Sequence, residues 1–278
     1  MDSTTRDWMG RVNSATKYPS IPYYHEMDDR GRYTDVVATP LRTDLSRLVC
    51  TEKVDGTNAR IIIHPGGDWQ IGSRTELLAA KGDRLYNPHE GIAGHLIDQA
   101  ETVVEAVRDS VGSVHAAHKV TVVYLEVYGL GIGAGWRNYT GDKHAGGARI
   151  FDIASFEQDI LLKNREEIAE LRGDTGRHLH WATVDRLATL TEALPFDMVP
   201  EIELPSLPPA GWRETEEWLQ ELVPSTHVAL DGGAKGRPEG VVIRHRDRST
   251  ITKLRLKEYA ATRRRLADED GKRDRAKA

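Results

Sequence analysis

The chain has 278 residues and a formal net charge of −5, a length that can bury a substantial core in one or two domains. Its one cysteine, Cys50, excludes an intramolecular disulfide and fits a reducing compartment. No apolar run approaches the length of a membrane span and the first residues lack the apolar core of a signal peptide, so we expect a soluble, cytoplasmic protein with no membrane partner.

The first predicted elements form a β-hairpin. Residues 59–64 are an apolar strand, Pro-Gly-Gly-Asp at 65–68 is a turn, and residues 69–72 are the returning strand. Residues 95–109 place apolar side chains near helical spacing, which predicts an amphipathic helix.

Strands and helices alternate through the rest of the chain. Strands are expected at 120–127, 148–154, 241–245 and 251–257, and helices at 164–172, 183–193 and 213–222. Residues 200–209 contain four prolines, which predict a rigid connector. This order of elements predicts an α+β protein with two antiparallel sheets.

A lysine flanked by carboxylates lies directly before the hairpin, in the run Glu-Lys-Val-Asp-Gly-Thr-Asn at 52–58. A lysine must lose its proton before it can act as a nucleophile, which requires burial, a nearby cation or a metal ion. Glu52 and Asp55 favour the protonated form of Lys53. The motif therefore predicts that other segments bring cations to Lys53.

Five further segments carry candidate functional side chains. They are 71–75 with Arg74, 122–129 with Glu126, 149–153 with Phe151, 239–244 with Glu239, and 253–257 with Lys253, Arg255 and Lys257. Taken singly, such residues can be structural: an arginine on the surface, a phenylalanine in the core, a glutamate at a turn. The last segment supplies the cations that the lysine motif requires.

The lysine motif and these segments together resemble the covalent nucleotidyltransferases, which comprise ATP-dependent DNA ligases, RNA ligases and mRNA capping enzymes. Three details favour RNA ligases of the nick-sealing, RNA-editing type: the Glu-Lys-x-x-Gly-Thr-Asn run, the glycine-rich 128–133, and Lys-Tyr-Pro-Ser-Ile at 17–21. Two positions depart from the family pattern. Leu125 stands where glycine is common, and Arg255 stands where the first lysine of a basic pair is usual, with Lys253 as the alternative.

The resemblance implies a nucleotidyltransferase domain of the ATP-grasp-like, ligase adenylation type, in which two antiparallel sheets flank a nucleotide cleft and helices lie at the periphery. We expect this domain to cover residues 1–265. Residues 266–278 mix charges of both signs and are expected to form a disordered tail.

The resemblance also implies roles for the motif residues. Lys53 attacks ATP, and Lys257, Arg255 and Arg74 assist catalysis. The expected nucleotide-binding set is Glu52, Lys53, Asn58, Arg74, Glu126, Phe151, Glu239, Lys253 and Lys257. Glu239 also supports a metal through water. ATP, consumed as covalent AMP, and Mg²⁺, which Mn²⁺ can replace, are the implied cofactors.

RNA with a 5′-phosphate and a 3′-hydroxyl is the implied partner. Residues 244–278 hold 13 Lys or Arg against 6 Asp or Glu, a charge of +7 that leaves −12 on the rest of the chain. A local basic region attracts phosphates, and Arg263, Arg264 and Arg265 are candidates for RNA contact. Whether the RNA is a nicked duplex or single-stranded, and whether a separate partner adds RNA binding, stays open.

Two other classes remain as alternatives. A minimal DNA ligase or another nucleotidyltransferase normally carries an oligonucleotide-binding barrel after the basic strand, and the 21 residues after Lys257 are too few for one. A non-catalytic nucleotide or RNA binder is disfavoured by the presence of Lys53, Glu126, Glu239 and Lys257.

Overall fold

The computed structural model describes residues 3–81, 83–84, 91–111, 118–133, 135–173, 175–234 and 236–277. The chain divides into two compact units. The first comprises residues 1–20, 55–199 and 230–234, and the second comprises 21–54, 200–229 and 235–278. The single domain expected over 1–265 is therefore built as two units, and the chain passes from the second to the first immediately after the lysine motif begins, between Val54 and Asp55.

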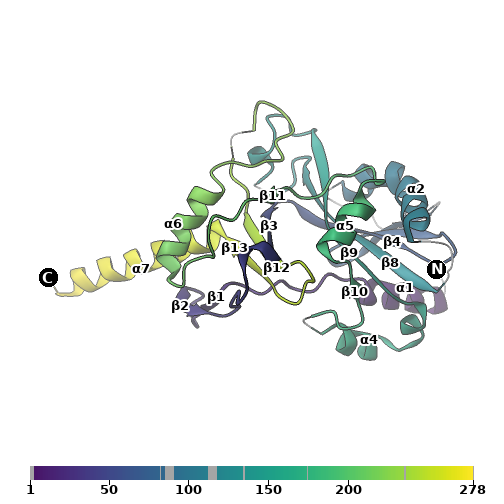
Figure 1. Ribbon diagram of the computed structural model, residues 1–278, viewed down its shortest axis with the longest axis horizontal. Coiled ribbons are helices and arrows are strands. Elements are labelled where there is room, and N and C mark those ends of the chain that lie inside the picture. The colour runs from purple at the N-terminus through teal and green to yellow at the C-terminus, as the bar shows by residue number, and fades with distance from the viewer. Residues whose placement is uncertain are drawn as a thin grey trace. The chain divides into compact units, whose positions relative to one another are not determined.

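The first unit is organised around a seven-stranded antiparallel sheet with the order β10-β9-β8-β4-β5-β6-β7 (Figure 1). Its strands are β4 (Thr57–Ile63), β5 (Trp69–Ser73), β6 (Leu77–Ala80), β7 (Asp83–Arg84), β8 (Lys119–Gly129), β9 (Gly146–Glu157) and β10 (His180–Trp181). The helices of this unit are α1 (Ser3–Ala15), α2 (Ile92–Val111), α4 (Arg165–Arg172) and α5 (Val184–Thr191), with short 3₁₀ turns at Gly135–Asn138 and Gln158–Leu162.

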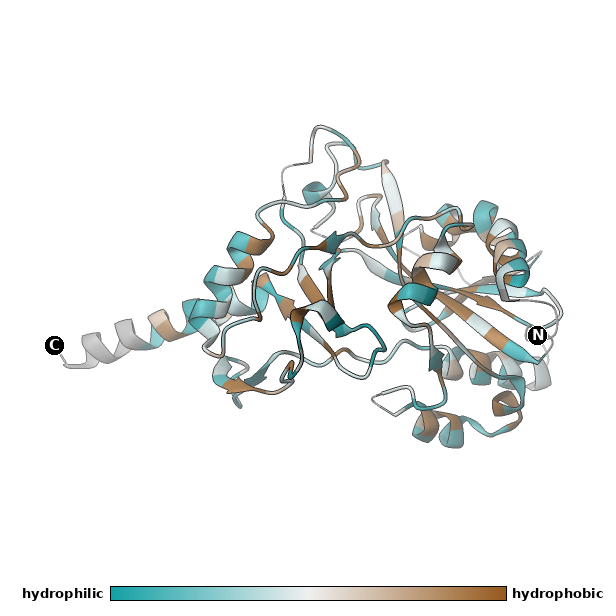
Figure 2. Ribbon diagram, in the orientation of Figure 1, coloured by the Kyte–Doolittle hydropathy of each residue, from teal (hydrophilic) through white to brown (hydrophobic). Residues whose placement is uncertain are grey.

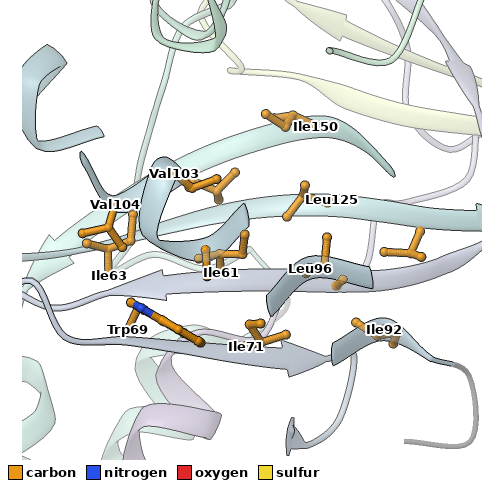
Figure 3. Close-up of a cluster of buried hydrophobic side chains, with 14 of the residues drawn as sticks. Ile61, Ile63, Trp69, Ile71, Ile92, Leu96, Val103, Val104, Leu125 and Ile150 are labelled. Carbon is orange, nitrogen blue, oxygen red and sulfur yellow. The ribbon is translucent and has the colours of Figure 1, made fainter. Parts of the chain in front are cut away.

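Helices cover both faces of this sheet, and each face has its own core. Successive strand residues point to opposite faces, so Ile61 and Ile63 of β4 pack with α2 and α5, whereas Ile62 packs with α1 and α4. Figure 3 shows the first of these cores, where Leu96 and Val103 of α2 lie against the strands. Figure 2 shows hydrophobic stretches along the strands of this sheet, as expected where both faces are covered.

The second unit contains a four-stranded antiparallel sheet with the order β11-β3-β12-β13 and a separate β1-β2 hairpin. These elements are β1 (His25–Met27), β2 (Tyr33–Val37), β3 (Leu48–Lys53), β11 (Glu201–Ile202), β12 (Gly240–His245), β13 (Ile251–Arg255), helices α6 (Trp212–Leu222) and α7 (Leu256–Lys277), and a 3₁₀ turn at Leu45–Arg47. One face of the sheet supplies Cys50, Val241 and Leu254 to a core that also contains Leu219 of α6 and Tyr259 of α7.

The α+β class and its antiparallel sheets are confirmed, as is every strand and helix expected from the hairpin to β12. The nucleotide cleft stays a prediction. Helix α1, the β1-β2 hairpin and strand β3 were not predicted from sequence, and the proline-rich connector contains the two-residue strand β11. Helix α1 was missed because it carries many polar residues and buries only short stretches such as Val12 and Ala15.

The C-terminal segment differs from expectation in two ways. Strand β13 ends at Arg255, and helix α7 begins at Leu256 and runs through Lys277, so residues 266–277 are helical. Strong helix formers follow Leu256, and Glu258 lies in the first turn, where a negative charge favours the helix dipole. Glu269 forms ion pairs with Arg30 at 2.8 Å and with Arg32 at 2.6 Å, which hold this part of α7 to the β1-β2 hairpin. Within the described residues, no helix is long and apolar enough to span a membrane.

Candidate active site

The lysine motif lies on a row of residues that crosses three neighbouring strands. Lys53 of β3 is opposite Gly240 of β12, and Gly240 is in turn opposite Arg255 of β13. Since Cys50 and Leu254 point into the core, the alternation of strand side chains places Lys53 and Arg255 on the other face of the sheet. The two cations thus flank a residue that has no side chain.

The carboxylate of Glu239 joins these two cations. One of its oxygens contacts Nζ of Lys53 and the other contacts Nη2 of Arg255. The Glu239 side chain is 9% exposed, against 23% for Lys53. A carboxylate this deeply buried is costly unless it is paired, and here both of its oxygens have a cationic partner.

Backbone hydrogen bonds also hold Glu239 in place. Its N–H donates to the carbonyl of Lys53 at 2.9 Å, and its carbonyl accepts from the N–H of Leu256 at 2.9 Å. Glu239 is therefore tied to the end of β3 and to the start of α7. A change in any of these three segments would move the carboxylate relative to Lys53.

Arg255 is held from more than one side. Its Nη1 lies 2.8 Å from Oε1 of Glu258 and 3.4 Å from the hydroxyl of Tyr23. Burial disfavours the charged guanidinium, but the attraction of Glu239, the hydrogen bond to Tyr23 and the attraction of Glu258 outweigh it and raise the pKa of Arg255 above its ordinary value. Arg255 is a fixed positive charge beside the lysine.

The other two residues of the predicted basic segment are placed differently. Lys253 puts Nζ 4.1 Å from the centroid of the Tyr23 ring, a cation–π geometry. Lys257 is exposed and is the second residue of helix α7, so the expectation that the basic strand extends to residue 257 is wrong. The N–H of Leu256, the first residue of α7, still donates to the carbonyl of Glu239 and so continues the register of β12 with β13 by one more pair.

Glu52 is engaged by the protein itself. It is 2% exposed and accepts hydrogen bonds from Oγ1 of Thr226 at 2.5 Å and from the N–H of His227 at 2.7 Å. Glu52 and Glu239 therefore have different partners. Glu52 positions the loop at residues 226–228, and Glu239 contacts the lysine directly.

Asn58 and Glu126 lie opposite each other on β4 and β8 of the first unit. The N–H of Gly56 donates to Oε1 of Glu126 at 3.2 Å, and the N–H of Asp55 donates to the hydroxyl of Tyr139 at 2.5 Å. Among the described residues, Oδ1 of Asn58 is buried and has no hydrogen-bond partner. A buried acceptor of this kind is expected to meet a donor from a ligand or water.

A bulge in β9 determines the position of Phe151. Tyr124 pairs with Asp152 and Leu125 pairs with Ile150, so Phe151 is the extra residue between two paired positions. Its ring centroid lies 6.2 Å from that of Tyr124 in a stacked arrangement, and it is partly exposed. The aromatic ring is thus fixed by the sheet and still accessible.

Arg74 is exposed in the turn that follows β5. The turn is held from the interior, because the buried Arg60 donates from Nη1 to the carbonyl of Arg74 at 3.4 Å. The structure therefore brings together Lys53, Glu239 and Arg255 in the second unit, and Asn58 and Glu126 in the first, while Arg74 and Lys257 are surface cations.

Sequence reasoning missed several residues that build the site: Tyr23, Tyr139, Thr226, Gly240 and Glu258. The spacing of three residues between Arg255 and Glu258 could have indicated that ion pair once the helix was known. Tyr23 and Thr226 carry no such signal, because they reach the site through long-range contacts.

The donor set for a metal ion is small. Within the described ranges, no group of three or more His, Cys, Asp or Glu side chains could hold a metal. Glu239 already bonds two cations. Glu239 is the carboxylate at this position that could meet a hydrated metal ion, since magnesium usually keeps several of its waters.

A family model described as RNA ligase matches residues 46–258. The chain belongs to the RNA ligase family. The matched region contains every residue of the predicted site, from Glu52 to Lys257, and it excludes the segment at 17–21 and the three arginines at 263–265.

Solved structures of the RNA ligase from Naegleria gruberi are similar to this member of the family, at low identity. A variant with ATP and Mn is 14% identical with a TM-score of 0.48, and the match covers 88% of this chain and 62% of that one. A variant with AMP and Mn is 12% identical with a TM-score of 0.46, over 87% and 62%. The ligase with pyrophosphate is 12% identical with a TM-score of 0.44, over 87% and 62%.

This RNA ligase family member thus spans less than two thirds of the length of those structures. No curated protein matches the chain.

The conformation of Gly240 yields a testable prediction. Its φ is +154°, and a Cβ there would lie 1.9 Å from the carbonyl oxygen of Leu254. Gly240→Ala should therefore destabilise the protein by roughly 1–3 kcal/mol, measured by chemical denaturation, because the strand must shift or adopt a strained backbone. Gly66→Ala is the matched control, since nothing lies within 4 Å of its Cβ position. Equal stability of the two variants would show that position 240 does not require glycine.

Proposed function

We propose that the chain is an ATP-dependent RNA ligase that works in three steps. Nζ of Lys53 bonds to the α-phosphorus of ATP, and the bond to the β-phosphate oxygen breaks, which releases pyrophosphate. An oxygen of an RNA 5′-phosphate then bonds to the same phosphorus and frees Lys53. In the last step a 3′-hydroxyl loses its proton and attacks the 5′-phosphate, AMP leaves, and a 3′-5′ phosphodiester forms.

The observation that carries this proposal is the bridge from Lys53 through Glu239 to Arg255. A nucleophilic lysine needs an acceptor for its proton and a cation for the charge that develops on the phosphate oxygens. Glu239 contacts the nitrogen that must lose the proton, and Arg255 is the fixed cation beside it. The three side chains thus supply what the first step requires.

Glu239 has two roles in this proposal. It aligns Nζ of Lys53 before the nucleotide arrives, and it is placed to take or relay the proton as the new bond forms. When phosphates enter, their oxygens compete with Glu239 for the guanidinium of Arg255. Arg255 then stabilises the equatorial oxygens of the reacting phosphorus, where the negative charge is spread.

We assign the first basic position of the family pattern to Arg255, and not to Lys253. Arg255 shares Glu239 with the nucleophile, whereas Lys253 stacks on Tyr23. An arginine presents a planar fork to phosphate oxygens and keeps its charge throughout the reaction. Lys257, exposed at the start of α7, is proposed to contact the phosphates of the leaving group or the RNA.

The first unit is proposed to bind the nucleoside and the RNA end. Glu126 would hold the ribose, and the accessible ring of Phe151 would stack on adenine. The unbonded Oδ1 of Asn58 offers an acceptor to a ribose or terminal hydroxyl of the substrate. Arg74, on a turn fixed from the interior, is proposed to bind the 5′-phosphate.

Magnesium, or manganese in its place, would neutralise the charge of the bound phosphates. Glu239 is the residue proposed to orient its water shell. The chain itself supplies a lysine nucleophile, a carboxylate that orients it and an arginine that stabilises the phosphate oxygens.

The three arginines at 263–265 are now weaker candidates for RNA contact than the sequence suggested. Nη1 of Arg265 donates to the carbonyls of Arg30 at 2.9 Å and Gly31 at 2.7 Å, and Nη2 of Arg263 lies 3.4 Å from Oε1 of Glu216. Replacing all three together would disturb the second unit as well as any RNA contact. We therefore propose Arg264 for RNA contact, because it is exposed and its Nε donates to the carbonyl of Ala260 in its own helix, at 3.3 Å, and not to another segment.

The first functional prediction concerns the covalent intermediate. Incubation with labelled ATP and Mg²⁺ should leave AMP on the protein through an acid-labile, base-stable phosphoramidate, detected after denaturing electrophoresis. Lys53→Ala should abolish the label, because it removes the attacking nitrogen. The matched control Lys163→Ala, an exposed lysine, should be labelled like the wild type. Labelling of Lys53→Ala, or preferential labelling by GTP, would show that the chain is not an adenylyltransferase of this kind.

The second prediction separates the two candidates for the first basic position. Arg255→Ala should slow self-adenylylation by roughly 10²–10³-fold, because a preorganised charge on the reacting phosphate is lost. Lys253→Ala should slow it by less than about tenfold, since it removes a cation–π contact outside the bridge. Single-turnover rates at saturating ATP provide the measurement, and the reverse order of the two effects would reassign the position to Lys253.

The third prediction concerns the polynucleotide. The enzyme should seal a junction that has RNA on the 3′-hydroxyl side, and its binding should weaken steeply with salt because phosphate contacts release counterions. Sealing with a pre-adenylated RNA strand bypasses the ATP step and measures the last step alone. Efficient sealing of an all-DNA nick, with no gain from RNA on the 3′-hydroxyl side, would instead identify a minimal DNA ligase.

A further inference from the structure

The first unit contains a polar pocket that the proposed reaction does not use. Its volume is about 500 Å³. It lies beside helix α1, and its polar lining consists of Asn13, Ser14, Lys17, Glu76 and Arg165. Glu76 is the one carboxylate among the lining residues that the structure describes.

Lys17 has unusual surroundings for a lysine. It is half-buried, and no hydrogen bond or ion pair joins its ammonium to another residue in the described part of the chain. Burial, together with the charges of Arg60 and Arg172, lowers the pKa of Lys17, and only Glu76 acts in the opposite direction. The fold therefore keeps an unpaired cation among other cations at the wall of a pocket, which an anion would stabilise.

The two arginines behind Lys17 have neutral partners. The fully buried Arg60 donates from Nη2 to Oδ1 of Asn13 at 2.5 Å, and its Nε has no partner among the described residues. Arg172 donates from Nη1 to the carbonyl of Ser14 at 3.0 Å and to its hydroxyl at 3.3 Å. These acceptors satisfy hydrogen bonds but do not neutralise the positive charge behind the pocket.

Arg165 also lines the pocket. Its guanidinium lies directly over Gly10 of α1, where a Cβ would come within 1.6 Å of Nη2. Its own partners are weak or uncharged: Nη2 donates to the carbonyl of Arg6 at 3.3 Å, and Nε lies 3.7 Å from Oδ1 of Asp7. Because Gly10 has no side chain, the guanidinium of Arg165 can lie beside the pocket as a second cation.

The pocket is connected to the turn that carries Arg74. Nδ2 of Asn13 donates to the carbonyl of Thr75 at 2.8 Å, and Arg60 donates to the carbonyl of Arg74. The side chains that line and support the pocket therefore also fix the turn from which Arg74 projects. A strand whose 5′-phosphate is held by Arg74 would have further phosphates near the pocket.

We propose that this pocket binds a backbone phosphate of the RNA strand, with Lys17 as its principal contact and Arg165 as a second. This inference rests on the proposed RNA ligase function. The site offers one unpaired ammonium and is bordered by Glu76, which suits a phosphodiester with its single negative charge. A backbone phosphate also suits the place of the pocket beside the turn that carries Arg74, and the triphosphate of ATP is the alternative that the test separates.

The salt dependence of RNA binding tests this proposal. Binding of a nicked duplex RNA is measured by fluorescence anisotropy between about 50 and 200 mM salt, and self-adenylylation is measured in parallel without RNA. Lys17→Gln removes the charge at similar side-chain length, and Lys17→Arg keeps it. Lys81→Ala is the matched control, because Lys81 is an exposed lysine paired with Glu101 and does not line the pocket.

Lys17→Gln should reduce the slope of log K against log salt by about 1, so that its affinity falls roughly fourfold less than that of the wild type across this range. Lys17→Arg and Lys81→Ala should keep the wild-type slope, and all three variants should self-adenylylate normally.

An unchanged slope in Lys17→Gln would overturn the inference and leave the proposed function intact. A raised KM for ATP in Lys17→Gln, with the RNA slope unchanged, would assign the pocket to the nucleotide triphosphate and also overturn it. If the wild type neither self-adenylylates nor binds RNA, the proposed function itself fails, and the inference fails with it.

Discussion

The buried carboxylate of Glu239 is the interaction on which the arrangement of the second unit depends. An ionised carboxylate with so little exposure is tolerated because Lys53 and Arg255 each meet one of its oxygens. The same residue bonds the backbones of β3 and α7. Gly240, next in the chain, pairs with both Lys53 and Arg255, and a Cβ there would lie 1.9 Å from the carbonyl oxygen of Leu254.

Lys53 has two acidic neighbours in the sequence, Glu52 and Asp55, and the structure shows which carboxylate contacts it. The two acidic residues beside it in the chain would keep a lysine protonated. In the structure the side chain of Glu52 accepts hydrogen bonds from the hydroxyl of Thr226 and the N–H of His227. The carboxylate that does meet Lys53 is balanced by Arg255.

In the first unit, the seven-stranded sheet positions the residues proposed to bind the nucleoside and the RNA end. Its strands place Asn58 and Glu126 side by side, and a single extra residue in β9 makes Phe151 available beside Tyr124. On the same face, the buried Arg60 ties helix α1 to the turn after β5. The helix that was hardest to predict from sequence thus supports both the exposed Arg74 and the cationic pocket around Lys17.

The sequence by itself determined the α+β class, most strands and helices, and the family to which the motifs belong, because hydrophobic periodicity and short motifs are local properties of the chain. Tertiary structure decided which charges meet. Arg255 and Lys253 are equivalent by spacing, and only strand register places Arg255 across Gly240 from Lys53. The pairing that holds Arg255 in this position is likewise long-range, since the bond from Leu256 to Glu239 joins residues 17 positions apart in the chain and is invisible to local patterns.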